Sequence, residues 1–436
     1  MALAAVRNSI LGGALALATS AGAVAPAYGA ASDMVVVRAG TVITVSGKEI
    51  PRGDIVIIDG KIDLIGTNLE FPKSATVIDA RDQVVMPGMI NAQTRFGMDG
   101  FRRSGNNSGE TAAKEIELSL FDFEPLISEG FVTAAFVPTG NNMPGRASVY
   151  RLAGPDGPEL LNESAYVPIS MTNPGGDKGQ LEAAIRQAEA EIAKAKKAKE
   201  DFDKKQAEEA KKKAEAEKNG EGKEAENGEK KNGNGEEKPA EFQPPEIPGD
   251  AQFFVDVLRE EATIPAVFEL SSASDYIHLL DALGDNAEKF GTTYSFTSTS
   301  GDFKEVIGRL GEKNAHVIVR PGISFLPSTT IRYSIPASLV AAGCTVTTVP
   351  PFDAPAGYEA MRLRMADLIR TGWSREDALK SVTMNPATLL GLSDESGSLE
   401  KGKRADLVFL NGDPLDPTSS VKAVMVGGEM VWEDDQ

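Results

Sequence analysis

Hydrophobic residues follow a strand-like pattern near both ends of the chain. Short runs rich in Val, Ile and other apolar residues are separated by polar turns, which is typical of β-strands. Asp59 and Gly60 separate two of these runs and favour a type I′ hairpin turn, which needs positive φ angles. Both end segments are therefore predicted to contribute to one β-sandwich. The runs cover residues 34–38, 41–45, 54–58, 61–65 and 76–78 near the N-terminus, and 406–410, 421–426 and 430–432 near the C-terminus.

The middle of the chain alternates between strand-like and helix-like segments. This alternation indicates parallel strands joined by helices, and so predicts an α/β fold. The candidate strands are 131–137, 165–171, 264–270, 292–297, 315–320 and 344–349, and the candidate helices are 109–129, 251–261, 274–283, 303–310 and 358–371.

The composition changes abruptly between residues 177 and 249. Residues 181–218 are rich in Ala, Glu and Lys with few apolar anchors, which predicts a solvent-exposed helix supported by i,i+4 charge pairs. Residues 219–249 are dominated by Gly, Asn, Glu, Lys and Pro, a composition that buries too little apolar surface to order itself. We interpret the segment as a tolerated insertion in one connection, with a partner-binding arm as the alternative.

Residues 1–30 have the pattern of a secretory signal peptide. Arg7 precedes an apolar run over residues 10–18, and small residues follow over 21–31. The run is shorter than the roughly 20 apolar residues that a transmembrane helix needs. We therefore expect cleavage near residues 29–31 and a periplasmic or secreted bacterial protein.

Composition narrows the class of protein further. A chain of 436 residues with 41% hydrophobic residues is able to bury a large globular core. The formal net charge of −19 argues against nucleic acid or an anionic membrane as the main partner, because phosphate binding needs a basic surface. Cys344 is the single cysteine, so the chain has no internal disulfide framework.

A short apolar run over residues 84–97 ends in polar side chains. It is entered through a turn at Pro87 and Gly88. Strand side chains alternate between two faces. We therefore expect three polar side chains to converge on one side, those of Asn91, Gln93 and Arg95, while Ala92, Thr94 and Phe96 point the other way.

This run resembles the end of the first barrel strand in the amidohydrolase superfamily, which reads Pro-Gly-hydrophobe-Ile-Asn/Asp-Ala-His-Thr-His. Here Gln93 and Arg95 stand where the family has two metal-binding histidines. A second resemblance, to imidazolonepropionase-like amidohydrolases, lies in Met-Asn-Pro-Ala at 384–387, Leu-Leu-Gly-Leu at 389–392 and Gly-Ser-Leu-Glu-Lys-Gly-Lys-Arg-Ala-Asp-Leu-Val at 397–408.

The resemblance implies a (β/α)8 TIM-like barrel with a β-sandwich domain formed by the N- and C-terminal segments. One of the eight barrel strands has no clear counterpart in the apolar pattern. The domains expected after the signal peptide are a composite β-sandwich over 31–83 and 398–436, and a barrel over 84–397 that carries the charged insertion at 177–249.

The resemblance also defines which metal ligands to expect. Family members hold zinc with histidines after strands one, five and six and with an aspartate after strand eight, which also serves as general base. This chain has two histidines. His278 falls inside a predicted helix on the barrel exterior, and His316 begins a predicted strand, away from the C-terminal strand ends where barrel sites lie. Pro351 stands where the aspartate is expected, so we expect no bound zinc or other cofactor.

A few charged residues remain as candidates for chemistry. Glu269 stands at the strand-five position and Asp353 two residues beyond Pro351, so the two carboxylates are weak catalytic candidates, while residues 298–300 occupy the strand-six region. Arg95 close to them is expected to neutralise the carboxylates rather than admit a dication.

The arginines allow two arrangements. Arg95, Arg320 and Arg332 would suit a cationic pocket for a carboxylate or phosphate ligand. Alternatively, they form internal ion pairs with Glu269, Asp353 or Asp99 that fill a vacated metal site. The turn-rich residues 141–146 either line this pocket or serve as a structural turn.

Three functions follow as hypotheses. By resemblance, the ancestral activity is hydrolysis of C–N bonds in non-peptide or peptide-like amides, and the missing ligands favour a pseudoenzyme without the family's metal catalysis. The second hypothesis is a non-catalytic binding subunit, in a homo-oligomer or paired with an intact amidohydrolase paralogue. The third is metal-independent hydrolysis in which Glu269 or Asp353 activates water.

Overall fold

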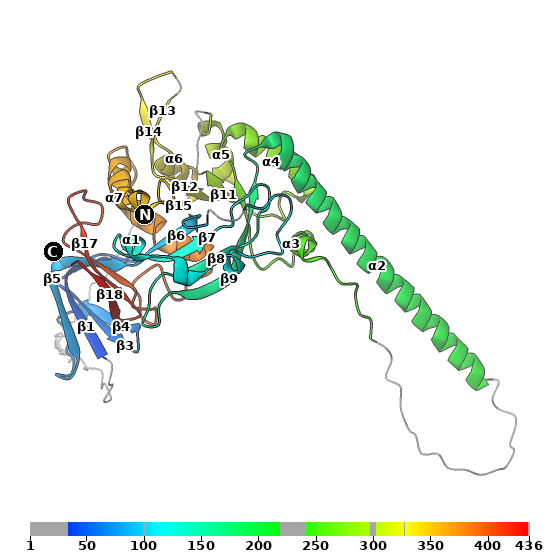
Figure 1. Cartoon of the computed structure of the whole chain (residues 1–436), viewed down its shortest axis with the longest axis horizontal. Helices are drawn as coiled ribbons and strands as arrows, with labels where there is room; N and C mark the ends of the chain where they lie inside the picture. The colour runs from blue at the N-terminus through cyan, green and yellow to red at the C-terminus, as the bar shows by residue number, and fades with distance from the viewer. Residues whose placement is uncertain (1–33, 99–101, 219–240, 297–301, 327, 435–436) are drawn as a thin grey trace, which may run out of the picture.

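The computed structural model describes residues 34–98, 102–218, 241–296, 302–326 and 328–434 (Figure 1). The predicted signal peptide lies outside these residues. The chain forms an α/β barrel with a separate β-sheet built from both chain ends, which confirms the predicted fold class. Within the described residues, no helix is both long enough and apolar enough to cross a membrane.

The separate sheet joins N- and C-terminal strands in one continuous hydrogen-bonded ladder, in the order β18-β17-β16-β5-β1-β3-β4, with β2 paired to β1. The central contact is between β5 and β16, where residues 84–87 pair with 407–410. Asp59 and Gly60 have φ angles of 50° and 73°, as the predicted hairpin turn requires. The strands are β1 (Met34–Val42), β2 (Ile50–Pro51), β3 (Gly53–Ile58), β4 (Lys61–Thr67), β5 (Thr76–Pro87), β16 (Leu407–Leu410), β17 (Val421–Val426) and β18 (Glu429–Glu433).

Gly88 marks the passage from this sheet into the barrel. Strand β5 ends at Pro87, and β6 (Met89–Thr94) begins one residue later. A Cβ atom on Gly88 would lie 2.3 Å from Cγ2 of Val132, so only glycine fits this close approach. The Pro-Gly pair therefore redirects the chain at the junction of the two parts.

The barrel sheet has eight strands in the order β15-β12-β11-β10-β9-β8-β7-β6, and β15 contacts β6 to close the ring. Strand β8 is antiparallel to both of its neighbours, so the barrel is not wholly parallel. This strand is the one that the apolar pattern missed. Besides β6, the strands are β7 (Phe131–Phe136), β8 (Ala147–Arg151), β9 (Glu159–Ser170), β10 (Ala266–Glu269), β11 (Thr293–Phe296), β12 (His316–Val319) and β15 (Thr345–Thr348).

Two apolar layers stabilise the barrel. Small and branched side chains, among them those of Ile90, Ala135, Val267 and Ile318, form one buried cluster with Tyr166. A larger cluster includes the apolar faces of the surrounding helices. The helices are α1 (Glu124–Ile127), α2 (Pro174–Lys218), α3 (Gly249–Leu258), α4 (Ala273–Leu283), α5 (Lys304–Glu312), α6 (Ile335–Ala342), α7 (Pro355–Ile369), α8 (Arg375–Ser381) and α9 (Met384–Leu389), with 3-10 turns η1 (Ala112–Lys114), η2 (Leu118–Leu120) and η3 (Gly284–Asn286).

The helix predicted over residues 109–129 is wrong. The segment contains only η1, η2 and the short helix α1. Thr111 pairs with Arg146 in a β-bridge, which fixes the start of the segment in an extended conformation. Pro125 lies in the first turn of α1, and proline is accommodated there but not in the interior of a longer helix.

The charged helix predicted over residues 181–218 is present as part of α2 (Figure 1). Its first half carries buried Leu181, Ile185 and Ala188 and contacts α3 and α4. The second half projects away from the barrel (Figure 1). Phe242, on the returning chain, packs against Phe202 with ring centroids 5.4 Å apart. Residues 219–240 lie outside the described part of the chain.

A two-stranded hairpin follows β12 and projects beyond the barrel (Figure 1). It consists of β13 (Ile323–Phe325) and β14 (Arg332–Ser334), paired antiparallel. The sequence pattern gave no signal for it, because each strand has only three residues. It follows Arg320 in the chain, and Arg320 belongs to the site described below.

Candidate functional site

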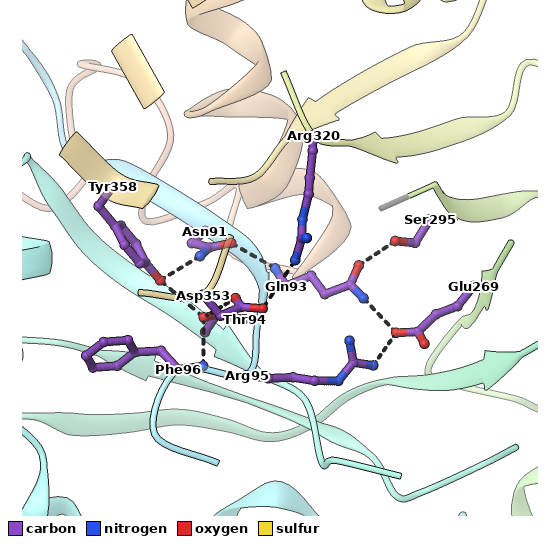
Figure 2. Close-up of polar contacts among 10 residues, drawn as sticks. All are labelled: Asn91, Gln93, Thr94, Arg95, Phe96, Glu269, Ser295, Arg320, Asp353 and Tyr358. Atoms are coloured by element: carbon purple, nitrogen blue, oxygen red, sulfur yellow. Dashed lines mark hydrogen bonds and ion pairs between the residues drawn. The ribbon is translucent and has the colours of Figure 1, made fainter. Parts of the chain in front are cut away.

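The end of β6 places two polar side chains against one carboxylate (Figure 2). Gln93 donates a hydrogen bond of 2.6 Å from Nε2 to Oε1 of Glu269, and Arg95 donates one of 2.5 Å from Nη2 to the same oxygen. Glu269 is the last residue of β10, and β10 lies across the barrel from β6 in the strand order. The predicted ion pair between Arg95 and Glu269 is therefore present.

Ser295 completes this group. Its hydroxyl donates a hydrogen bond of 2.5 Å to Oε1 of Gln93, so both ends of the Gln93 amide have a partner. Gln93 is 5% exposed, and an unpaired buried amide group would cost about 1–3 kcal/mol. The group is therefore a satisfied polar network that links β6, β10 and β11.

A second group surrounds the hydroxyl of Tyr358, from α7. Asn91 donates to it from Nδ2 at 2.9 Å, and the Thr94 hydroxyl lies 3.1 Å away. The prediction that Asn91 shares a face with Gln93 and Arg95 is therefore wrong, because Asn91 and Thr94 point to the same partner. The pairing of β6 with β7 shifts register between Asn91 and Thr94, which breaks the regular alternation.

The second predicted carboxylate belongs to this group. Thr94 Oγ1 donates a hydrogen bond of 2.9 Å to Oδ1 of Asp353, and Arg320 Nη2 lies 3.2 Å from Oδ2. Arg320 follows β12 and Asp353 follows β15, so both come from C-terminal strand ends as expected for a barrel. Each of the two carboxylates therefore has its own arginine (Figure 2).

Burial and charge act together on the titratable groups here. The carboxylate of Glu269 raises the pKa of the Arg95 guanidinium above its ordinary value, against the effect of burial. Burial raises the pKa of the hydroxyls of Tyr166 and Tyr358, so both stay protonated at neutral pH. The Tyr166 hydroxyl donates to the carbonyl oxygen of Ala92 at 2.9 Å and supports the same strand.

These side chains do not fit a catalytic zinc. Zinc takes neutral imidazole, thiolate or carboxylate donors, usually three or four of them. Gln93 offers a single amide oxygen that already accepts a bond, and the guanidinium of Arg95 has no acceptor at all. Across the part of the chain that the structure describes, no group of three or more His, Cys, Asp or Glu residues has an arrangement that would hold a metal ion.

The remaining predicted positions lie elsewhere or have other contacts. Arg332 is exposed on β14, and Pro351 precedes Asp353 in the loop after β15. Asp99 and residues 298–300 lie outside the described residues.

The two histidines have the structural positions expected of them. His278 is half-buried on α4. His316 is the first residue of β12, and its Nε2 lies 2.8 Å from the hydroxyl of Thr347.

Residues 141–146 serve the fold. Met143 and Arg146 form β-bridges with Asn106 and Thr111, and the buried Asn142 side chain donates to Asp177 at 2.6 Å. These contacts agree with the structural turn among the two predicted alternatives.

Sequence reasoning missed two hydroxyl groups of the site. Tyr358 sits inside a predicted helix and Ser295 inside a predicted strand, and neither position belongs to a motif. A possible signal is the Thr-Tyr-Ser-Phe run of β11, where Ser295 is a polar residue between large aromatic ones.

Comparisons with known proteins agree with this architecture. Residues 351–431 match the amidohydrolase family. The chain is 42% identical over 66 residues to N-acetylglucosamine-6-phosphate deacetylase of Rattus norvegicus, which is 15% of each chain. It is 31% identical over 110 residues to imidazolonepropionase of Symbiobacterium thermophilum, 24% of this chain and 25% of that one. These matches thus span a quarter or less of the relatives' length.

Solved structures extend the likeness to the whole fold. An amidohydrolase from Thermotoga maritima superposes with a TM-score of 0.64 at 22% identity, over 92% of this chain and 100% of that one. A prolidase solved in complex with N-methylphosphonate-L-proline gives a TM-score of 0.51 at 14% identity over the same shares. The barrel and the sheet made of both chain ends therefore have the fold of these solved structures, and residues 351–431 are similar to the amidohydrolase family.

Proposed function

We propose that this chain is an amidohydrolase-superfamily protein that lacks the family's metal-dependent hydrolysis of C–N bonds in amide or peptide-like substrates. The observation that carries the proposal is the contact of 2.5 Å between Arg95 Nη2 and Glu269 Oε1. A guanidinium stands at a position where relatives have a metal-binding histidine. It supplies one positive charge to the carboxylate without any Lewis-acid site.

The charge balance supports the same proposal. Arg95 and Arg320 neutralise Glu269 and Asp353, so the four side chains sum to zero charge. A dication placed among them would be repelled by both guanidinium groups and would have to displace two ion pairs. The charges at the barrel mouth, the end of the barrel that carries Arg95, Glu269, Arg320 and Asp353, are thus neutralised by these side chains themselves.

The barrel mouth still suits a small ligand with an acidic or amide group. The side chains of Arg95 and Arg320 are 26% and 31% exposed, so each reaches solvent beyond its carboxylate partner. Arginine binds carboxylate and phosphate groups through several N–H groups at once. In this proposal a ligand shares these donors with the internal carboxylates.

Activity assays test the proposal. Dipeptides and N-acetylated amino sugars and amino acids are incubated with the purified chain, with and without added zinc. We expect no turnover above the rate of the Gln93→Ala/Glu269→Ala variant in either condition. Zinc-stimulated hydrolysis that the double substitution abolishes would contradict the proposal.

Metal-independent hydrolysis with Glu269 or Asp353 as general base is the competing chemistry. Both carboxylates already accept bonds from arginine and from Gln93 or Thr94, which leaves fewer lone pairs to take a proton from water. If zinc-free turnover is found and falls on Glu269→Gln or Asp353→Asn, this alternative replaces the pseudoenzyme.

A non-catalytic subunit is a second candidate function. The β13–β14 hairpin supports it, because Phe325 and Ile331 on this projecting element are 51% and 57% exposed. Large exposed apolar side chains favour contact with another protein. Native mass spectrometry after co-expression with a paralogue that retains the His-x-His motif tests it. A complex lost on Phe325→Ser/Ile331→Ser would support the subunit, and an unaltered monomer in both cases would refute it.

Export remains part of the proposal and rests on the sequence of residues 1–30. N-terminal sequencing of the protein from its native host tests it. A mature chain that begins near residues 29–31 is expected, and a retained N-terminal segment would contradict export by signal cleavage.

A further inference from the structure

A cavity of about 380 Å³ lies beside the candidate site, directly after β6. Phe96, Gly97 and Met98 form one side of it, and the chain around η2 forms the other. Phe96 follows Arg95, and its ring packs edge-on against Tyr358 with centroids 6.3 Å apart. The cavity is therefore a neighbour of the ion-paired residues but does not include them.

The walls of this cavity are apolar and partly aromatic. Phe121 lines it and packs on Phe123 and Phe136, with ring centroids 5.6 Å and 6.2 Å away. A Cβ atom on Gly97 would lie 2.0 Å from the Phe121 ring, so glycine at this position is required for the close fit of the two walls. Leu120 at the edge is 81% exposed.

Carboxylates supply the charge among the described lining residues. Glu115, Glu117 and Asp122 line the cavity, and none of the described residues that line it is Lys, Arg or His. The Glu115 side chain is 3% exposed, and neither of its oxygens accepts a hydrogen bond from the described residues. Arg103 is a close cation, with Nη2 at 2.9 Å from Oε1.

We propose that this cavity binds an organic cation with an apolar body, such as an aromatic amine or the basic side chain of a peptide. The aromatic walls would hold the apolar part, and the rings of Phe96 and Phe121 would attract the charge by cation–π contact. The carboxylates at the edge would neutralise the ammonium group. The chain's net charge of −19 favours the approach of cations over anions.

This inference does not depend on the loss of metal chemistry. The cavity would hold the same class of ligand whether or not the barrel mouth turns over a substrate. Failure of one proposal therefore leaves the other intact, because binding at the cavity and hydrolysis at the mouth are measured separately.

Three matched probes test the class of ligand by titration calorimetry. They share a phenyl ring and differ in charge: 2-phenylethylamine, 2-phenylethanol and 3-phenylpropionate. We expect the amine to bind about tenfold more tightly than the alcohol, with 3-phenylpropionate the weakest, because partly exposed carboxylates attract a cation modestly and repel an anion. Equal binding of the three probes, or no binding of the amine, would overturn the proposal.

Substitutions separate the charge from the apolar wall. Glu117→Gln/Asp122→Asn should bring the amine down to the affinity of the alcohol, and Asn at 122 still accepts the bond from the Glu124 backbone N–H. Leu120→Ser should weaken the amine and the alcohol alike. Glu124→Gln is the matched control, since this exposed carboxylate lies outside the lining and its loss should change neither affinity.

A spectroscopic readout locates the probe. Met98 lines the cavity, and a phenyl ring beside its methyl group would shift that methyl resonance in protein labelled with [¹³C-methyl]methionine. Met98→Leu assigns the resonance. A shift with the amine that disappears in Glu117→Gln/Asp122→Asn supports the site, whereas binding without any shift of the Met98 methyl places the probe elsewhere and refutes the proposal.

Discussion

The C-terminal segment and the barrel mouth follow the amidohydrolase pattern to different degrees. Residues 351–431 match the family, and most of this segment lies outside the candidate site, to which it contributes Asp353 and Tyr358. Asn385 donates to the carbonyl of Val346 at 2.6 Å, and a Cβ atom on Gly397 would lie 2.7 Å from Cβ of Ala387, so this turn needs glycine. At the mouth, by contrast, Gln93 and Arg95 stand where the resemblance implies two metal-binding histidines.

This difference indicates that the fold and the polar groups of the barrel mouth are held by separate interactions. The sheet and barrel are stabilised by apolar clusters that the mouth residues do not share. The mouth is stabilised by its own ion pairs and hydrogen bonds among Gln93, Arg95, Glu269, Arg320 and Asp353. A metal is thus unnecessary for keeping these polar groups paired, and the following predictions test the separation.

The largest effect is expected in the scaffold. Phe409 of β16 is 1% exposed in the core of the separate sheet. Phe409→Ala should lower the free energy of unfolding by about 3–5 kcal/mol, because it removes apolar contacts and leaves a cavity. Urea unfolding followed by circular dichroism measures the loss. Phe325→Ala on the exposed hairpin is the control, and a similar loss there would contradict the assignment of the core.

A pH effect is expected at the opposite end of the barrel from the mouth. Burial lowers the pKa of His316 to about 4, below its ordinary 6.5. As the pH falls from about 6.5 to 4, the unfolded chain binds the proton first, so stability is lost over this window and levels off below it. The loss is about 3 kcal/mol for such a shift. His316→Gln should remove this part of the pH dependence, and an identical profile for both proteins would count against it.

A smaller effect is expected at the first ion pair of the mouth. Arg95→Met leaves Glu269 with Gln93 as its remaining partner and should cost about 2 kcal/mol, less than for a fully buried pair because both side chains are partly exposed. The double variant Arg95→Met/Glu269→Gln should recover much of the loss. A double-mutant cycle measures the coupling, and purely additive effects would show that the pair contributes nothing.

The smallest effect is expected at Thr94. Its hydroxyl donates to Asp353, lies near Tyr358 and accepts a bond from the backbone N–H of Phe96. Thr94→Val keeps the shape and should cost about 1 kcal/mol. Thermal unfolding of Thr94→Val is compared with that of Thr94→Ser, which keeps the hydroxyl. The comparison distinguishes the loss of the hydrogen bonds from the loss of packing. A larger loss in Thr94→Ser than in Thr94→Val would assign the effect to the methyl group.

Much of the scaffold could be predicted because it depends on local patterns. Strands β7, β10, β11, β12 and β15 follow apolar runs, and Asp59-Gly60 specifies its turn by its φ angles. Strand β8 was missed because its pairing with β7 and β9 is decided by contacts rather than by its own five residues. The false helix over 109–129 came from periodicity that β-bridges and Pro125 override.

The site was only partly predictable for the same reason. Ion pairing of the arginines with Glu269 and Asp353 was one of two arrangements predicted from opposite charges at C-terminal strand ends, and which arginine meets which carboxylate did not follow from the sequence. The direction of Asn91 did not follow, because it depends on a register shift in β6. Tyr358 reaches Thr94 across 264 residues of sequence, and no local pattern encodes such a contact.

The metal content of the chain tests the central claim most directly. Protein purified without chelator, and again after incubation with zinc and desalting, is analysed by inductively coupled plasma mass spectrometry. Because Arg95 and Arg320 already neutralise the two carboxylates, we predict metal far below one equivalent in both samples. Near-stoichiometric zinc that is lost on Gln93→Ala/Glu269→Ala would contradict the account and return the mouth to metal-dependent hydrolysis.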